Sequence, residues 1–369
     1  MNDRINLGGA HMSEEVEAAV LEVLRSGWPG PGPLADSFET AFADYCGGNH
    51  PVALNSCTAA LHIAIRLLNL KPGTEVITTP ITFVATNQVI LYEQLVPVFA
   101  DVEPTTGNIN VDSIENRITD RTGAIMVVHY GGYPCDLDAV YTLADQHNLQ
   151  VIEDCAHAAG ASYKGRRIGS HAGLQAFSFQ ATKNLSAIDG GLLFARSDNE
   201  VMRARRLRWM GIDSSTHIRT TQLGGSNLYG VSEVGYRYAM SDLNAAIALA
   251  QLPHLDEGNR FRAAVAARYD AAFSSLDSIH LLEHQQDRVS SHHLYAILSD
   301  RRDELAAALR SRNIVTGTHY PRNDLYAIFT THELPGAEYF SNRVITLPIH
   351  LGLGDTDIDR VIEAVLAFT

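Results

Sequence analysis

The feature that most constrains this chain is a series of short apolar runs, separated by helical segments, between about residues 50 and 200. Strands that are buried on both faces read as continuous apolar runs, whereas strands with one wet face alternate. Helical patterns at 57–69 and 136–147 are interspersed with these runs. The order predicts an α/β domain with a mainly parallel sheet flanked by helices. The predicted strands are 75–79, 95–100, 124–129, 150–153, 175–179 and 191–195.

The last third of the chain has a different pattern. An Ala-rich helix is predicted at 242–252, with Pro253 just beyond it, and a long helix at 254–274. Two further helices and two short strands then alternate, which is typical of an α+β arrangement. We therefore expect a large domain over 1–250 and a smaller C-terminal α+β domain over 251–369. The later elements are helices 302–311 and 355–368 and strands 293–298 and 343–347.

Composition narrows the classes of function. The 369 residues carry a net charge of -14, and an acidic surface repels phosphate backbones, so we expect no nucleic-acid partner. No run approaches the roughly 20 apolar residues that a membrane span needs, and the N-terminus lacks a signal-peptide pattern, so we expect no membrane partner. The four cysteines are scattered without a C-x-x-C pair, which indicates reduced thiols in a cytoplasmic protein and no metal site.

A lysine follows one of the predicted strands in the segment AFSFQATKNLSAIDGG, residues 176–191. A side chain just beyond a strand can reach a cleft at the carboxyl edge of a parallel sheet, where α/β proteins bind ligands. The Lys183 amine could attack an aldehyde or ketone carbon once deprotonated, and burial favours that state. On this segment alone, a solvated loop lysine is the alternative.

A carboxylate follows a second strand in LQVIEDCAH, residues 149–157. Pyridoxal-phosphate (PLP) chemistry needs a carboxylate against the pyridine nitrogen, so that the protonated ring works as an electron sink. Asp154 fits that position, and His157 could hydrogen-bond the phenolic oxygen of the ring. The alternatives are a helix N-cap for Asp154 and a structural role for His157.

A third segment, LNSCTAALHIAI at 54–65, turns from a strand-like stretch into a helix. The first N–H groups of a helix bind phosphate, and here they belong to about Thr58 and Ala59. Ser56 or Thr58 could equally be a plain N-cap. The order of the three segments along one α/β domain favours a PLP site.

Several further blocks extend the pattern over the whole chain, among them SGWPGPGP at 26, TTPITFVATNQVI at 78, DVEPTTGNIN at 101 and YAMSDLNAAIALAQL at 238. With these blocks the sequence strongly resembles the DegT/DnrJ/StrS nucleotide-sugar aminotransferases, which are fold-type I PLP enzymes. The resemblance runs from end to end. It implies a homodimer whose active sites are completed across the subunit interface.

The resemblance also implies a role for each matching residue. Lys183 matches the lysine that forms the Schiff base, and Asp154 and His157 match the partners of the ring nitrogen and the phenolic oxygen. Further positions match as follows: Phe83 stacks on the ring, Thr58, Ala59 and Ser178 bind the phosphate, and His319 and Tyr320 orient the sugar. Because position 183 is lysine, the branch of the family that carries histidine there and performs dehydration is disfavoured.

The sequence departs from the family pattern in three places. Arg237 and Ala239 replace the polar pair that many relatives carry ahead of Met240, where the neighbouring subunit helps to close the cofactor pocket. Arg237 is our candidate for a contact to the cofactor phosphate at this point. The Gly-Glu-Gly-Gly after the lysine becomes 188–191, Ile-Asp-Gly-Gly, and Trp209 and Met210 replace a more polar pair. The last two changes bear on the sugar pocket, and so on the identity of the substrate, more than on the chemistry.

The expected reaction moves an amino group from L-glutamate to a nucleotide-linked 4-keto- or 3-keto-6-deoxyhexose, with pyridoxamine phosphate as the intermediate cofactor form. Two alternatives remain open. One is an aminotransferase for a free keto-inositol, which uses the same lysine. The other is a non-catalytic PLP- or sugar-binding regulator, which would be expected to lose Lys183 or Asp154.

Overall fold

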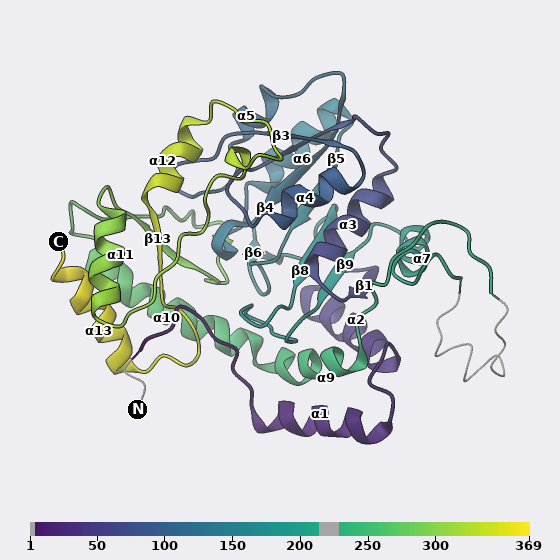
Figure 1. The fold of residues 1–369 in the computed structure, drawn as a ribbon, viewed down its shortest axis with the longest axis horizontal. Coiled ribbons are helices and arrows are strands. Elements are labelled where there is room, and N and C mark those ends of the chain that lie inside the picture. The colour runs from purple at the N-terminus through teal and green to yellow at the C-terminus, as the bar shows by residue number, and fades with distance from the viewer. Residues whose placement is uncertain (1–3, 214–228) are drawn as a thin grey trace.

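The computed structural model describes residues 4–213 and 229–369, and its centre is a seven-stranded sheet of order β1-β9-β8-β5-β4-β2-β3 (Figure 1). Neighbours from β3 to β8 are parallel, whereas β9 runs antiparallel to both β8 and β1. All six predicted strands are present, so the prediction of a mainly parallel sheet is confirmed. The strands are β1 (Pro51–Leu54), β2 (Glu75–Thr78), β3 (Val96–Phe99), β4 (Thr122–Val128), β5 (Gln150–Asp154), β8 (Leu174–Ser178) and β9 (Gly191–Phe194).

Helices cover both faces of this sheet. On β4, Ala124 and Met126 pack into the core beneath α3, α4 and α7, and Ile125 and Val127 pack into the core beneath α5 and α6. Every strand residue in these positions is buried, which is why the strands read as apolar runs. The helices are α3 (Cys57–Leu68), α4 (Ala85–Tyr92), α5 (Val111–Glu115), α6 (Leu137–His147) and α7 (Asp198–Leu207).

Two helices cover the part of the sheet formed by β1, β8 and β9, and a third packs on the outside of one of them. Helix α2 (Pro33–Cys46) packs against the sheet through Phe38 and Phe42, and α1 (Glu14–Ser26) packs against α9 (Asp242–Gln251) at the bottom of Figure 1. Helices α1, α2, α4, α5 and α7 were not among the predicted elements. For α1 the local signals are nonetheless present: three glutamates in its first turn and a left-handed Gly27 after its last residue.

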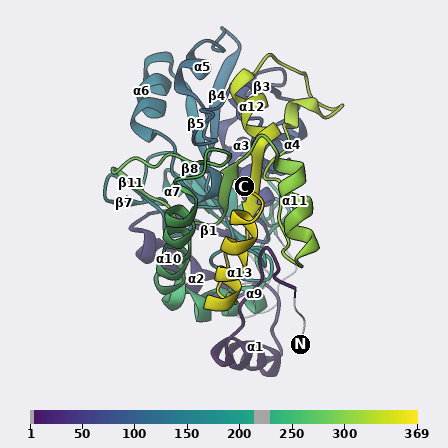
Figure 2. The same ribbon diagram turned by 90° about the vertical axis from the view of Figure 1, so that its left-hand side faces the viewer.

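The C-terminal part contains the predicted α+β arrangement (Figure 2). Helix α10 (Leu255–Phe273) follows α9 after a 3-10 turn over Leu252–His254 that holds Pro253. A small sheet of order β10-β12-β13 packs with α10, α11 and α13 around a cluster of buried residues that also contains Ile5. Backbone hydrogen bonds between Ile5 and residues 313 and 315 tie the N-terminal segment to this part of the molecule. The other elements are β10 (His280–Leu281), β12 (Tyr295–Leu298), β13 (Val344–Leu347), α11 (Arg302–Ser311), α12 (Pro335–Arg343) and α13 (Asp355–Leu366).

A third, three-stranded sheet joins the two parts. It pairs β11 (Arg288–Val289) with β6 (Ser162–Tyr163) and β7 (Arg166–Arg167). Two 3-10 turns, Tyr130–Gly132 and Asn323–Leu325, complete the elements described. Within the ranges 4–213 and 229–369, no helix is both long enough and apolar enough to cross a membrane.

The contact between α2 and the sheet gives a test of the fold. Phe42 is fully buried, and its ring lies 5.1 Å from the rings of both Phe177 and Phe179. We expect Phe42→Ala to lower the free energy of unfolding by about 3–5 kcal/mol, because it leaves a cavity that the surrounding rings cannot fill. Thr40→Ala, on the exposed face of the same helix, should change it by less than about 0.5 kcal/mol. Urea unfolding measures both, and similar values for the two variants would contradict this account of the core.

Candidate active site

A cavity of about 560 Å³ lies between the carboxyl edge of the central sheet and the C-terminal part. Three parallel strands each bring a residue to it at their carboxyl ends: Val128, Asp154 and Ser178. Ligands of α/β proteins bind at this edge because the loops there surround a crevice. The other walls come from the start of α3, the loop after β2, the loop between β8 and β9, the C-terminal part, and Leu7 and Gly8 of the N-terminal segment.

Lys183 lies in the loop between β8 and β9, and its side chain lines the cavity. Strand β9 pairs antiparallel with β8, with Ser178 opposite Gly191, so this loop is held at the cavity edge. Gly191 is required there, because a Cβ on it would lie 2.3 Å from the carbonyl oxygen of Ser56 at the start of α3. Lys183 is therefore not a solvated loop residue.

The amine of Lys183 is surrounded by protein atoms although part of the side chain faces the open cavity. Burial lowers the pKa of Lys183 to about 8, against the opposing effects of Cys57 and Asp154. Nζ lies 3.5 Å from Nε2 of His293. About a tenth of the amine is then neutral, and nucleophilic, at pH 7, and about half at pH 8.

Asp154 ends β5 at the floor of the cavity. Its Oδ2 accepts a hydrogen bond from the Thr86 hydroxyl at 2.7 Å, and its Oδ1 accepts one from the Ala156 N–H at 3.0 Å. Burial raises the pKa of Asp154, and these two donors oppose that rise. Asp154 caps no helix, since turns follow β5, so the alternative role as an N-cap does not apply.

His157, three residues beyond Asp154, also lines the cavity, and one of its ring nitrogens has no partner among the described residues. Its Nε2 lies 3.1 Å from the Tyr320 hydroxyl, whereas its Nδ1 is buried without a hydrogen-bond partner in the part of the chain that the structure describes. Burial holds the pKa of His157 well below its usual value, so the ring is neutral. If the Tyr320 hydroxyl donates to Nε2, Nδ1 carries the proton and can donate to a ligand oxygen.

The start of α3 gives a mixed result. The Ser56 hydroxyl caps the helix by accepting the Ala59 N–H at 3.1 Å, as the N-cap alternative predicted. Ala59 does not line the cavity, so its N–H is not free for a phosphate in this arrangement. The first N–H groups of a helix have no partner within it, which leaves those of Cys57 and Thr58, both in the cavity wall, for an anion.

The other predicted residues divide into two sets. Phe83, 61% exposed, and Ser178, His319 and Tyr320 all line the cavity. Arg237 does not: its guanidinium lies over the Trp209 ring, 4.1 Å from the centroid. The structure thus brings together eight predicted residues in one cavity and leaves Ala59 and Arg237 outside it. The eight are Thr58, Phe83, Asp154, His157, Ser178, Lys183, His319 and Tyr320.

His293 and its supporting network were missed by the sequence analysis, which placed residue 293 in a strand. The Asn184 amide nitrogen donates to the Ser291 carbonyl and to Asn259, so its Oδ1 accepts from Nδ1–H of His293 at 3.1 Å. Nε2 of His293 is then an acceptor that faces Lys183. These residues come from distant segments, and no local spacing signals the network.

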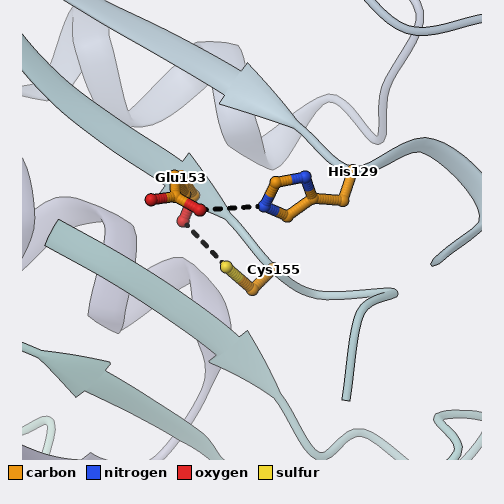
Figure 3. A group of neighbouring side chains, drawn as sticks. All are labelled: His129, Glu153 and Cys155. Carbon is orange, nitrogen blue, oxygen red and sulfur yellow. Dashed lines mark hydrogen bonds and ion pairs between the residues drawn. The ribbon is translucent and has the colours of Figure 1, made fainter. Parts of the chain in front are cut away.

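A second group of polar side chains lies on the other face of β5 (Figure 3). Among the residues described, His129, Glu153 and Cys155 are close enough to hold a metal ion. Nδ1 of His129 accepts the Cys135 N–H at 3.1 Å and Nε2 lies 3.0 Å from Glu153, which also accepts from Gln175 and Tyr141. Because both ring nitrogens of His129 are engaged, this fully buried group is explained by its own hydrogen bonds.

The donor set of the cavity fits pyridoxal phosphate. It offers a buried carboxylate at a strand end, a lysine with a lowered pKa, an unpartnered buried imidazole nitrogen and a helix N-terminus, as described above. The cofactor, when bound, supplies an electron sink for negative charge at the carbon that reacts.

Comparisons with known proteins agree with this geometry. The family model described as the DegT/DnrJ/EryC1/StrS aminotransferase family matches residues 10–366. The spore coat polysaccharide biosynthesis protein SpsC of Bacillus subtilis is 38% identical over 95% of this chain and 93% of its own length. The sugar aminotransferase CalS13 from Micromonospora echinospora is 32% identical with a TM-score of 0.92, over 98% of this chain and 99% of that chain.

A further solved relative bears on the cofactor. Spr1654 from Streptococcus pneumoniae is known in a PLP form and a PMP form, with 29% identity and a TM-score of 0.91. Each form covers 98% of this chain, and the match takes in 98% of the PMP-form chain and 97% of the PLP-form chain. The predictions of a fold-type I architecture and of pyridoxal phosphate as cofactor are therefore confirmed. The chain belongs to the DegT/DnrJ/EryC1/StrS aminotransferase family, and it is a PLP-dependent sugar aminotransferase of that family.

Proposed function

We propose that this enzyme transfers the amino group of L-glutamate to a nucleotide-linked keto-6-deoxyhexose, aminated at C3 or C4, in amino-sugar biosynthesis. The observation that carries the proposal is the Lys183 amine, with its lowered pKa, in one cavity with Asp154 and His157. The polysaccharide role in the name of SpsC and the sugar role in that of CalS13 support the substrate class. An antibiotic or polysaccharide pathway would use such a product.

The residues of the cavity have distinct roles in this proposal. Lys183 carries the cofactor and moves the proton at the α-carbon of the donor as general base and then acid. Asp154, held by Thr86 and Ala156, keeps the ring nitrogen protonated, and His157 donates to the phenolic oxygen. The remaining assignments are Phe83 against the ring, Thr58 and Ser178 at the phosphate with the N-terminus of α3, and His319 and Tyr320 beside the sugar.

We further propose a cytoplasmic homodimer in which each subunit helps to complete the other's site. The large exposed fraction of Phe83 leaves the cavity open at one rim, and Arg237 lies outside its own chain's cavity. A partner subunit at that rim would cover Phe83 and bring its own Arg237 to the phosphate. Within each subunit we propose a large domain over 1–250 and a small domain over 251–369, supported by the separate buried cluster around α10 and α13, which Ile5 joins from the N-terminal segment.

The first prediction concerns Lys183. Purified wild type loaded with PLP should show a visible absorbance band that L-glutamate abolishes as the pyridoxamine form accumulates. Lys183→Ala should lack this band. Its turnover with glutamate and a nucleotide-linked ketosugar should fall by about 10²–10⁴-fold or more. Lys164→Ala, which removes an exposed lysine paired with Asp138, is the matched control and should behave as wild type. A wild type whose band no amino donor changes would refute transamination.

The pKa of Lys183 gives a second prediction. The chain has three lysines, Lys71, Lys164 and Lys183, so labelling can be followed at each by mass spectrometry. In cofactor-free protein, the rate of arylation of Lys183 by trinitrobenzenesulfonate should rise with pH through a midpoint at about 8 and level off above it, since burial lowers its pKa to about 8 and only the neutral amine reacts. The hydrogen bond to Asp138 raises the pKa of Lys164, which should react only at higher pH. A midpoint for Lys183 near the ordinary lysine value would contradict the assignment.

The third prediction tests the shared site. Arg237→Ala should weaken PLP binding, and Lys183→Ala should be inactive. If Arg237 serves the partner's site, subunits mixed by reversible dissociation should regain about one quarter of wild-type activity, because random pairing gives each mixed dimer one intact site. If sedimentation shows dimers but mixing restores no activity, Arg237 either serves its own chain's site or does not contact the cofactor at all.

A further inference from the structure

Arg262 is a buried cation in the wall of the active-site cavity. It lies on α10, which runs below β13 in Figure 1, and only 5% of its surface is exposed. Gly258, one turn earlier, makes room for the guanidinium, since a Cβ there would lie 3.2 Å from Nη1. His293, His319 and His350 line the same region of the cavity.

The guanidinium has no counter-charge in the part of the chain that the structure describes. Its Nη1 is fully buried without a hydrogen-bond partner, and no ion pair to it is present among residues 4–213 and 229–369. Burial lowers the pKa of Arg262 to about 10, which still leaves it charged at neutral pH. A buried charge without a partner is costly, so it persists where a ligand supplies the partner.

Arg322 shows what a structural arginine looks like in this protein. It is the other arginine buried among the described residues, 7% exposed, and its guanidinium donates to both carboxylate oxygens of Asp324, at 3.0 and 2.7 Å. That pair is satisfied within the fold. Arg262 instead lines the cavity with no carboxylate partner among the described residues, and its planar guanidinium is suited to a carboxylate or a phosphate.

The position of Arg262 discriminates between these two anions. Arg262 and His293 line the same cavity, and Nε2 of His293 lies 3.5 Å from the reacting amine of Lys183. After burial and Lys183, the charge of Arg262 also contributes to the lowered pKa of His293. A carboxylate of an amino-acid donor is a few bonds from the carbon that reacts. The diphosphate of a nucleotide sugar is separated from the reacting carbonyl by the sugar ring and belongs nearer the cavity mouth.

We propose that Arg262 is the binding site for a carboxylate of the amino-acid donor and of the 2-oxo acid that it becomes. The inference rests on the proposed transamination and adds to it the group that selects the donor. Bound carboxylate completes the charge pair that the protein alone leaves open. Donor and ketosugar occupy the cavity in turn, so Arg262 should matter for the first half-reaction and little for the second.

The test uses the PLP-loaded enzyme, with Arg262→Met, which keeps the length of the side chain, and Arg262→Lys. Stopped-flow absorbance gives the half-saturating concentration of L-glutamate and the limiting rate of the first half-reaction. We expect Arg262→Met to raise the half-saturating concentration about 10- to 100-fold, as for the loss of a charged hydrogen-bonded pair, and Arg262→Lys to raise it less. Half-saturation by the ketosugar should change less than about threefold in both variants.

Two further measurements do not depend on turnover. Calorimetric binding of glutarate, an unreactive dicarboxylate, should be detectable in wild type and lost in Arg262→Met. The melting temperature of Arg262→Met should not fall, because the variant removes an unpaired buried charge. The matched control is Arg268→Met on the same helix, where the arginine pairs with Asp355 and Asp359 on the surface; it should leave glutamate and glutarate binding unchanged.

Unchanged glutamate half-saturation in a folded Arg262→Met would overturn the proposal. A rise confined to the half-saturating concentration of the ketosugar would also overturn it and would assign Arg262 to the diphosphate. A large drop in the melting temperature of Arg262→Met would show instead that Arg262 has a structural role. If Arg262→Met does not fold, Arg262→Lys decides by the same measurements. Wild type that responds to no amino donor refutes the proposed function itself, which is a different result from a responsive wild type with an unaffected variant.

Discussion

The parallel pairing of β4, β5 and β8 is the constraint on which the active site depends. Parallel neighbours must be joined by crossover connections, so their carboxyl ends meet at one edge of the sheet. Val128, Asp154 and Ser178 therefore reach one cavity although they are far apart in the chain. The antiparallel return of β9 then fixes the loop that carries Lys183 at the same edge, and Gly191 allows that strand to pass close to the start of α3.

Desolvation is the main electrostatic effect inside this cavity, and it acts in opposite directions on acids and bases. It lowers the pKa values of Lys183, His157 and His293 and raises that of Asp154. For the lysine this favours the neutral amine that the chemistry needs, and for Asp154 the hydrogen bonds from Thr86 and Ala156 counteract it. Arg262 is the group for which burial is not relieved by any partner within the described chain.

The two sides of the cavity differ in how they are held. The sheet side is fixed by pairing within the central sheet, whereas the side formed by the C-terminal part is held by the small sheet of β11, β6 and β7 together with side-chain contacts. Asn184 links the lysine loop to Asn259 of α10 and to His293, and the N-terminal segment reaches the same part of the molecule through Ile5. The site thus joins three regions of the chain, and the hydrogen bond from Asn184 orients His293 toward Lys183.

Local sequence order is enough to predict the central sheet and two of the residues at its edge. Apolar runs mark strands buried on both faces, and Asp154 and Lys183 follow such runs directly, so local order was enough to place them together. The residues that face Asp154 and Lys183 across the cavity are fixed only by the tertiary packing. His293 and Arg262 sit in ordinary strand and helix patterns, the Ala59 N–H is taken by Ser56, and Arg237 stacks on Trp209 instead of reaching its own chain's cavity. These outcomes depend on packing between segments far apart in the chain, and neither propensity nor spacing within one segment contains that information.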